Sequence, residues 1–331
     1  MTPTTPLALP DGPMLLTDGG LETTLIFHEG FDLPSFAAFP LLASEPGRDA
    51  LRRYYRAYLA IARRHGLGII LETATWRASA DWGALLGYDA AALRDITVAA
   101  VDLLRELRDA EAEPSTVLIS GCVGPRGDGY SADLRMTPDE AAAYHHAQIA
   151  TLAAAGVDLV SAHTITHVEE AIGIVRAGAS VDVATVMSFT VEVDGRLPSG
   201  QPLTEAILQL DDATDAGALH LMVNCAHPTH LEAALDPTSP ALARLRGFRA
   251  NASTMSHAEL DEAEALDAGD PHDLAQRVAA LTATLPALTV LGGVLRHRRP
   301  PHRRDRCGVR PAIGRTRCPR VDRRSRHPVR G

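Results

Sequence analysis

Cysteine and acidic side chains near the ends of short apolar runs are the residues of this chain best suited to chemistry. Cys122 and Cys225 stand at such positions, and so do Asp18 and Glu72. A cysteine thiolate is a nucleophile and a metal ligand, and a carboxylate binds a cation. An isolated cysteine is nevertheless most often a small buried residue, and an isolated acid most often a turn or cap residue. The chain contains no lysine, which excludes a Schiff-base lysine and a P-loop.

Such residues need a scaffold, and the sequence predicts eight strands to carry them. Runs rich in Val, Ile, Leu and Thr alternate with segments of helical spacing, which is typical of a parallel α/β fold. The expected strands are Met14–Asp18, Gly68–Thr73, Thr116–Gly121, Val157–His163, Ala184–Phe189, Leu219–Cys225, Gly247–Asn251 and Leu288–Gly292. The expected helices include Asp49–His65, Asp89–Glu111, Thr137–Ala155 and Glu169–Arg176. This alternation predicts a (β/α)8 TIM barrel, in which polar residues at the carboxyl ends of the strands share one face.

Composition divides the chain into two parts. The 331 residues carry a formal net charge of −9, yet residues 295–331 alone hold 14 arginines against two acids. This Arg- and Pro-rich segment has no apolar stripe, so we expect it to be disordered and the eighth barrel helix to be missing or disordered. The sequence therefore predicts a barrel over residues 1–294 and an aberrant tail over 295–331. No apolar run is long enough to span a membrane, and we expect a cytoplasmic protein with no membrane partner.

Six ordered motifs at the expected strand ends resemble the homocysteine S-methyltransferase family. They are Asp18-Gly19-Gly20, Glu72-Thr73-Ala74-Thr75-Trp76, Gly121-Cys122-Val123-Gly124-Pro125, Ser188-Phe189-Thr190 with Gly200-Gln201-Pro202-Leu203, Asn224-Cys225 and Gly292-Gly293. The resemblance implies a zinc-dependent barrel enzyme. It would move a methyl group from a sulfonium donor, S-methylmethionine or S-adenosylmethionine, to the thiol of homocysteine and release methionine. Zinc would deprotonate that thiol, so no protein base would be needed.

The resemblance also implies roles for individual residues. Cys225 matches the first zinc ligand of the family. Asp18 and Gly19 match the segment that holds the amino-acid end of homocysteine, where a carboxylate suits an ammonium group. The other substrate-binding candidates are Thr73 and Trp76 from the second strand, His163 from the fourth and Asn224 from the sixth.

Two positions depart from the family pattern. The family has a glutamate near the end of the fourth strand that contacts the substrate amine, and His163 is its equivalent here. A neutral histidine accepts a hydrogen bond but does not attract the ammonium by charge. After Gly293 the family continues with a cysteine pair that supplies two of its three zinc ligands, whereas this chain has Val294 and Leu295. We therefore expect poor zinc occupancy.

The genetic code permits one explanation for the tail. A GC-rich coding sequence exists for residues 294–308 that encodes CCGTDARHIDAIAA when it is read from its second base. That string restores the cysteine pair and begins an ordinary helix. We therefore hypothesise a frameshift at about codon 294, either in the gene or in its determined sequence.

Other interpretations use the same residues differently. Cys225, His227 and His230 could form a replacement zinc site, although such histidines more often cap a helix or face solvent. A catalytically inactive barrel would bind a small amino acid or, through its arginine tail, a polyanion. Nucleic acid is disfavoured because the tail has no aromatic residue on which a base could stack.

Overall fold

Eight parallel strands form a closed barrel in the computed structural model, which describes residues 14–111, 116–262, 267 and 269–294. The strands follow one another in chain order, and β8 pairs back to β1. They are β1 (Leu15–Thr17), β2 (Gly68–Glu72), β3 (Val117–Val123), β4 (Leu159–Ile165), β5 (Thr185–Phe189), β6 (His220–Ala226), β7 (Leu245–Asn251) and β8 (Val290–Val294). The predicted (β/α)8 barrel is confirmed.

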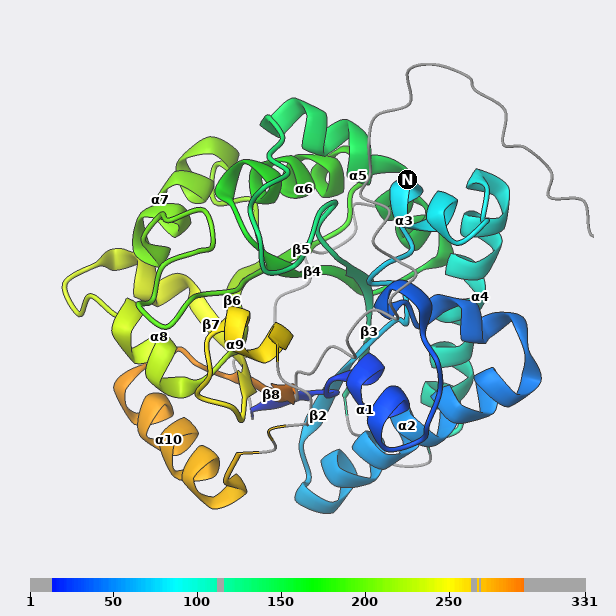
Figure 1. Ribbon diagram of the computed structural model, residues 1–331, viewed down its shortest axis with the longest axis horizontal. Helices are drawn as coiled ribbons and strands as arrows, with labels where there is room; N and C mark the ends of the chain where they lie inside the picture. The colour runs from blue at the N-terminus through cyan, green and yellow to red at the C-terminus, as the bar shows by residue number, and fades with distance from the viewer. Residues whose placement is uncertain (1–13, 112–115, 263–266, 268, 295–331) are drawn as a thin grey trace, which may run out of the picture. The chain divides into compact units, whose positions relative to one another are not determined.

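Helices surround the ring of strands, as Figure 1 shows in a view along the barrel. They are α1 (Leu21–Phe27), α2 (Glu45–His65), α3 (Ala80–Leu85), α4 (Ala90–Asp109), α5 (Pro138–Ala155), α6 (Val168–Ser180), α7 (Leu203–Thr214), α8 (Pro228–Ala234), α9 (His257–Glu262) and α10 (Pro271–Thr284), with 3₁₀ turns at Pro34–Phe36, Phe39–Ala43 and Pro240–Arg244. Local sequence sets their ends. Thr137 and Glu140 form a capping box at the start of α5, and Gly156 ends this helix with a φ of 84°. Among the described residues, no helix combines the length and the apolar character needed to cross a membrane.

The interior of the barrel is apolar at one end and polar at the other. One cluster of buried apolar side chains draws a residue from each of six strands, namely Leu15, Ile70, Leu159, Val186, Met222 and Val290. Six strands of a closed ring can contribute to one cluster only through its inside. Further along the strands, toward their carboxyl ends, the buried residues are polar, among them Asp18, Glu72, Ser188 and Asn224. The residues able to do chemistry therefore lie at the carboxyl ends of the strands, and the opposite end of the barrel is filled by packed apolar side chains.

Two strands are irregular where they reach the polar end. The register between β4 and β5 shifts around Thr164, and the register between β6 and β7 shifts around Cys225. Both residues adopt a positive φ, 66° for Thr164 and 55° for Cys225. Such a conformation is uncommon for a residue other than glycine, and a bulge re-aims the side chains beside it. The two bulges therefore set the direction in which Cys225 points.

The predicted tail lies outside the described residues. This segment, residues 295–331, would contain the eighth helix that we expect to be missing or disordered, so that expectation and the domain boundary at residue 294 stay predictions.

Candidate functional site

A pocket of about 650 Å³, its open mouth included, lies at the carboxyl ends of the strands. Residues that follow β1 and β2 line it together with residues of β3, β4, β6 and β7. All seven site residues expected from the sequence contribute to its wall: Asp18, Gly19, Thr73, Trp76, His163, Asn224 and Cys225. The barrel thus brings together side chains that are more than 200 positions apart in the sequence.

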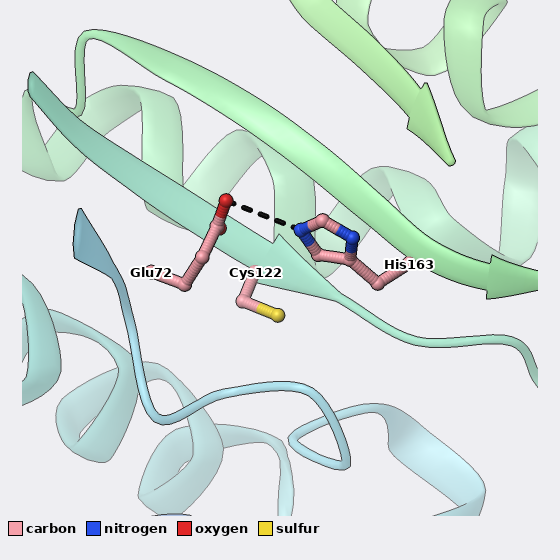
Figure 2. A group of neighbouring side chains, drawn as sticks. All are labelled: Glu72, Cys122 and His163. Carbon is pink, nitrogen blue, oxygen red and sulfur yellow. Dashed lines mark hydrogen bonds and ion pairs between the residues drawn. The ribbon is translucent and has the colours of Figure 1, made fainter. Parts of the chain in front are cut away.

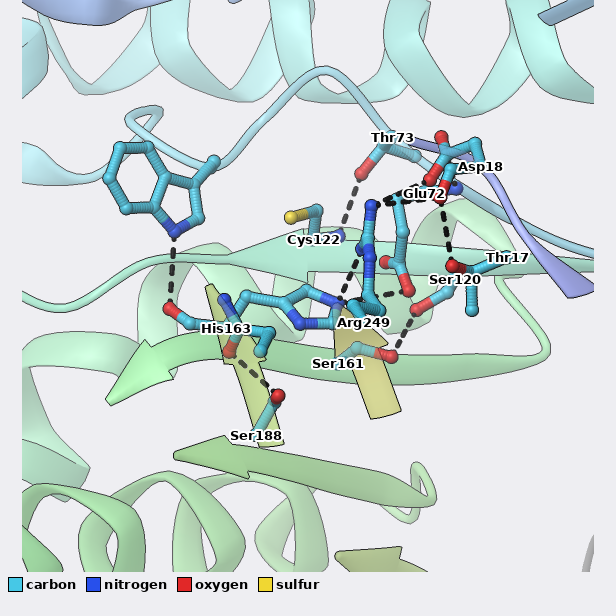
Figure 3. Close-up of polar contacts among 12 residues, drawn as sticks. Thr17, Asp18, Glu72, Thr73, Ser120, Cys122, Ser161, His163, Ser188 and Arg249 are labelled. Atoms are coloured by element: carbon cyan, nitrogen blue, oxygen red, sulfur yellow. Dashed lines mark hydrogen bonds and ion pairs between the residues drawn. The ribbon is translucent and has the colours of Figure 1, made fainter. Parts of the chain in front are cut away.

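Four buried ionisable residues form a polar cluster in this pocket: Asp18, Glu72, His163 and Arg249 (Figure 3). Arg249 Nη2 donates to Asp18 Oδ1 at 3.0 Å and to the carbonyl oxygen of Gly19 at 2.7 Å. Arg249 Nη1 lies 3.1 Å from His163 Nε2, and that nitrogen lies 3.1 Å from Glu72 Oε1. The backbone N–H of Glu72 donates to Asp18 Oδ2 at 3.3 Å. The polar cluster therefore connects the ends of four strands.

Burial dominates the electrostatics of the polar cluster. It raises the pKa of Asp18 to about 8, although the positive charge of Arg249 acts in the opposite direction. Burial also lowers the pKa of His163, which favours a neutral imidazole at neutral pH. For Glu72 the effect of burial is outweighed by His163 and Arg249, and the pKa lies below its usual value. The polar cluster consequently holds one acid whose ionised form is favoured, one guanidinium and one acid that titrates near neutrality. Glu22, which also lines the pocket, is a further such acid, because burial raises its pKa to about 7.

Asn224 fixes the two bulges with one side-chain amide. Its Oδ1 accepts from the backbone N–H of Thr164 at 2.9 Å and from Ser188 Oγ at 2.7 Å. Its Nδ2 donates to Thr164 Oγ1 at 2.9 Å and lies 3.2 Å from Cys225 Sγ. A backbone N–H can only donate, so it identifies the amide oxygen and fixes the orientation of the amide. Asn224 thereby determines how Cys225 faces the pocket.

The remaining predicted residues shape the wall of the pocket. Trp76 Nε1 donates to the carbonyl oxygen of His163 at 3.1 Å, and this bond holds the indole over the β4 end. Thr73 Oγ1 accepts from a backbone N–H of β3 at 2.9 Å. A Cβ at Gly19 would lie 2.0 Å from Tyr58 Oη, so a larger residue there would have to displace the Tyr58 ring.

One group of three possible metal ligands is present in the described part of the chain. Single ligand atoms of Glu72, Cys122 and His163 all lie within 4.8 Å of one another (Figure 2). A cation there would face the guanidinium of Arg249, whose Nη1 is 3.1 Å from His163 Nε2. Burial also raises the pKa of the Cys122 thiol well above its ordinary value, which disfavours the thiolate that a metal needs. This group does not fit zinc while Arg249 is in place.

Cys225, the predicted zinc ligand, lies outside that group. It is half-buried and lines the pocket, but residues 294 and 295 supply no donor side chain, so one cysteine remains of the three-ligand set. The alternative with His227 and His230 receives no support among the described residues. His227 caps α8 through the backbone N–H of Thr229, and His230 Nε2 contacts the carbonyl oxygen of Thr254 at 3.1 Å. Helix capping by His227 was expected, but exposure to solvent was not found, because both histidines are buried.

Sequence reasoning missed Arg249. It lies within the buried part of β7, where an arginine is exceptional and signals an anionic partner. Glu72 was noticed as an acid at the barrel rim, but its contact with His163 was not anticipated.

Comparison with known proteins gives a consistent result. A family profile described as Homocysteine S-methyltransferase matches residues 15–294. A protein of Escherichia coli (strain K12) named Homocysteine S-methyltransferase is 27% identical over 248 residues, which cover 71% of this chain and 74% of that protein. Crystal structures of the homocysteine methyltransferase MmuM from Escherichia coli share the fold at 22% identity over 86% of this chain. The metallated form has a TM-score of 0.65 with 93% of its chain covered, and the apo form 0.60 with 92% covered.

Proposed function

The chain belongs to the homocysteine S-methyltransferase family, a family of enzymes, and on this basis we propose that it transfers a methyl group from a sulfonium donor to the thiol of homocysteine and releases methionine. One observation carries the proposal. The seven residues expected from the family resemblance all line a single pocket at the carboxyl end of a closed barrel. That face is where barrel enzymes hold their substrates. We further propose that the enzyme acts in the cytoplasm, where Cys122 and Cys225 would stay free thiols.

The reaction is a nucleophilic displacement at the methyl carbon. The sulfur of homocysteine attacks in line with the carbon–sulfur bond of the donor, and the new bond forms as that bond breaks. The bonding electron pair stays on the donor sulfur, which leaves as a neutral thioether. In this scheme the polar cluster holds the amino-acid end of homocysteine, and Trp76 helps to exclude water from the reacting atoms.

The thiol must lose its proton before it attacks. At pH 7 about 3% of a free thiol with a pKa of about 8.5 is ionised. Within the described residues, the single group of three possible ligands does not fit zinc, and Cys225 lacks the cysteine pair that the family resemblance implies after Gly293. We propose instead that the chain as written is an impaired methyltransferase, and that a cysteine pair after Gly293 would restore full activity.

Restoring that pair tests the proposal. We would compare the chain with its V294C/L295C variant, measuring zinc content by mass spectrometry and methionine formation from homocysteine. S-methylmethionine and S-adenosylmethionine would be supplied separately to identify the donor. We expect little zinc and slow turnover in the chain as written, and stoichiometric zinc with much faster turnover in the variant. Adding Cys225→Ala to the variant should remove both gains. Stoichiometric zinc in the original chain that survives Cys225→Ala would contradict the assignment of this ligand.

Sequencing the gene across the codons for Gly292 to Cys307 tests the frameshift hypothesis independently. A coding sequence that lacks the shift would regain the cysteine pair, and we would then expect ordinary zinc-dependent activity. A confirmed frame would leave the impaired enzyme as the natural product of this gene.

The substitution of Val294 and Leu295 for the cysteine pair favours one second candidate, a barrel that binds a small amino acid without turnover. This candidate predicts that methionine binds with the same affinity to both proteins and that neither forms methionine. Activity of the V294C/L295C variant would exclude it as the function of this fold.

A further inference from the structure

The polar cluster contains buried polar atoms that have no hydrogen-bond partner. They are Arg249 Nε, Glu72 Oε2 and His163 Nδ1. Buried polar groups in native proteins are nearly always paired, because an unpaired one loses its hydration without compensation. The side chains of Glu72 and Arg249 are only 6% and 7% exposed, and both residues line the pocket. Unpaired atoms in such a place point to a missing ligand.

The contacts of His163 show that Arg249 or Glu72 has further hydrogen-bonding capacity that no neighbour uses. Its Nε2 lies 3.1 Å from both Arg249 Nη1 and Glu72 Oε1, yet a ring nitrogen carries either one proton or one lone pair. If Nε2 is protonated it donates to Glu72, and the facing N–H of Arg249 has no acceptor. If Nε2 is a lone pair it accepts from Arg249, and Glu72 has no donor. In either tautomer the polar cluster has an unsatisfied guanidinium N–H or an unsatisfied carboxylate oxygen in addition to the atoms above.

The unused donors and acceptors have opposite charges and are adjacent. Arg249 uses Nη2 for Asp18 and Gly19, which leaves Nη1 and Nε for another anion. Glu72 uses Oε1 for His163, and Ser120 is a further hydrogen-bonding neighbour of its carboxylate. No side chain meets Oε2 with good hydrogen-bond geometry, which leaves this oxygen for a cation. Since Arg249 Nη1 and Glu72 Oε1 both lie 3.1 Å from one nitrogen, the two charges are presented side by side. A free α-amino acid carries a carboxylate and an ammonium group on neighbouring atoms, with the matching arrangement.

We propose that Arg249 binds the α-carboxylate and Glu72 the α-ammonium group of the substrate, so that the pocket selects sulfur compounds that are free α-amino acids. This inference rests on the proposed function, because that function supplies an amino-acid thiol as the ligand. Arg249 and Glu72 determine specificity here: they contact the end of the substrate that does not react. Glu72 supplies the negative charge for the substrate ammonium group that the neutral side chain of His163 cannot supply.

Three thioethers that differ only in their charged groups separate the two contacts. They are L-methionine, 3-(methylthio)propylamine, which lacks the carboxylate, and 4-(methylthio)butanoate, which lacks the ammonium. Binding of each to the full chain would be measured by isothermal titration calorimetry at pH 7, with no donor and no added metal. Methionine should bind more tightly than either analogue by about tenfold to a hundredfold, the value of a charge-assisted hydrogen bond in a buried site.

Substitutions at both residues complete the thermodynamic cycle. In Arg249→Met the advantage of methionine over 3-(methylthio)propylamine should disappear, while its advantage over 4-(methylthio)butanoate remains. In Glu72→Gln the advantage of methionine over 4-(methylthio)butanoate should disappear, while its advantage over 3-(methylthio)propylamine remains. Arg249→Lys keeps the charge and should recover part of the lost advantage. Because Arg249→Met leaves Asp18 unpaired, the variant D18N/R249M provides a neutral background for the same comparison, and circular dichroism checks that each variant is folded.

The outcomes separate this inference from the proposed function. If methionine binds the native chain and keeps its advantage over 3-(methylthio)propylamine in both Arg249→Met and D18N/R249M, Arg249 is not the carboxylate contact and the inference is wrong. The proposed function would stand in that case. If the native chain binds none of the three thioethers, both the inference and the proposed function are contradicted.

Discussion

Asn224→Ala is the substitution with the largest expected effect on the architecture of the pocket. The amide of Asn224 joins β4, β5 and β6 through Thr164, Ser188 and Cys225, and all of its hydrogen-bonding capacity is used. Alanine would leave two buried donors without an acceptor, the backbone N–H of Thr164 and the hydroxyl of Ser188. Each unpaired buried donor costs about 1–3 kcal/mol, so the expected loss of unfolding free energy is about 2–6 kcal/mol.

Ser188→Ala provides the matched control for this substitution. It removes one donor to Asn224 Oδ1, while the oxygen keeps its bond from the backbone of Thr164. Its expected cost is only about 1 kcal/mol, that of a single satisfied hydrogen bond. Urea unfolding followed by tryptophan fluorescence and by circular dichroism would measure both variants, and agreement of the two probes would check two-state behaviour. If Asn224→Ala costs no more than Ser188→Ala, the amide does not hold the bulges and our account of how Cys225 is aimed is wrong.

Three other measurements test the electrostatics and burial. Asp18 has a folded-state pKa of about 8, so between about pH 4 and 8 the folded chain keeps a proton that the unfolded chain lacks, and the contribution of Asp18 to stability falls as the pH rises. Asp18→Asn should reduce this slope in urea titrations, leaving the part due to Glu22, whose pKa burial raises to about 7, and an unchanged slope would refute the prediction. His220 makes the free energy of unfolding depend on pH in the opposite direction, because burial lowers its pKa to about 3 and stability is lost as the pH falls below about 6.5. At pH 5 this loss should be about 2 kcal/mol, and it should be absent in His220→Leu. Iodoacetamide should modify half-buried Cys225 before buried Cys122, as resolved by peptide mass spectrometry; equal rates would contradict the pocket geometry.

Much of the barrel was predictable because each strand is marked by a pattern in its own short stretch of sequence. Each strand is a short apolar run that ends in a polar or glycine-rich segment, and β5 was expected at Ala184–Phe189 and found at Thr185–Phe189. At the carboxyl ends, β3, β4 and β8 each run two residues further than expected. For β4 the expected end was His163 and the observed end is Ile165. The bulge at Thr164 lets pairing continue past polar residues, and a pattern of alternating apolar residues does not reveal a bulge.

The pocket was predictable only in part, for a physical reason. Motifs at strand ends identified residues that line it, because the closed barrel gathers every strand end on one face. Arg249 and its contact with Asp18 were missed, because the two residues are 231 positions apart and no local pattern links them. The tautomer of His163 likewise depends on neighbours from other strands. Charge pairing across a barrel is a tertiary property that spacing does not encode.

Asp18 and Arg249, which are 231 residues apart in the sequence, meet in the pocket. Ligand binding there therefore depends on how far folding has advanced. The seam of the barrel is short, since β1 pairs with β8 through Leu15 with Val290 and Leu16 with Leu291. Bringing together residues so distant along the chain costs about 5 kcal/mol of chain entropy, so this contact forms late. An amino acid held between Glu72 and Arg249 would therefore bind only a chain whose last strands have docked. Such a ligand would stabilise the pairing of β1 with β8, because Glu72 on β2 and Arg249 on β7 flank these two strands. The backbone amides of Leu15–Thr17 should then exchange with deuterium more slowly when methionine is present.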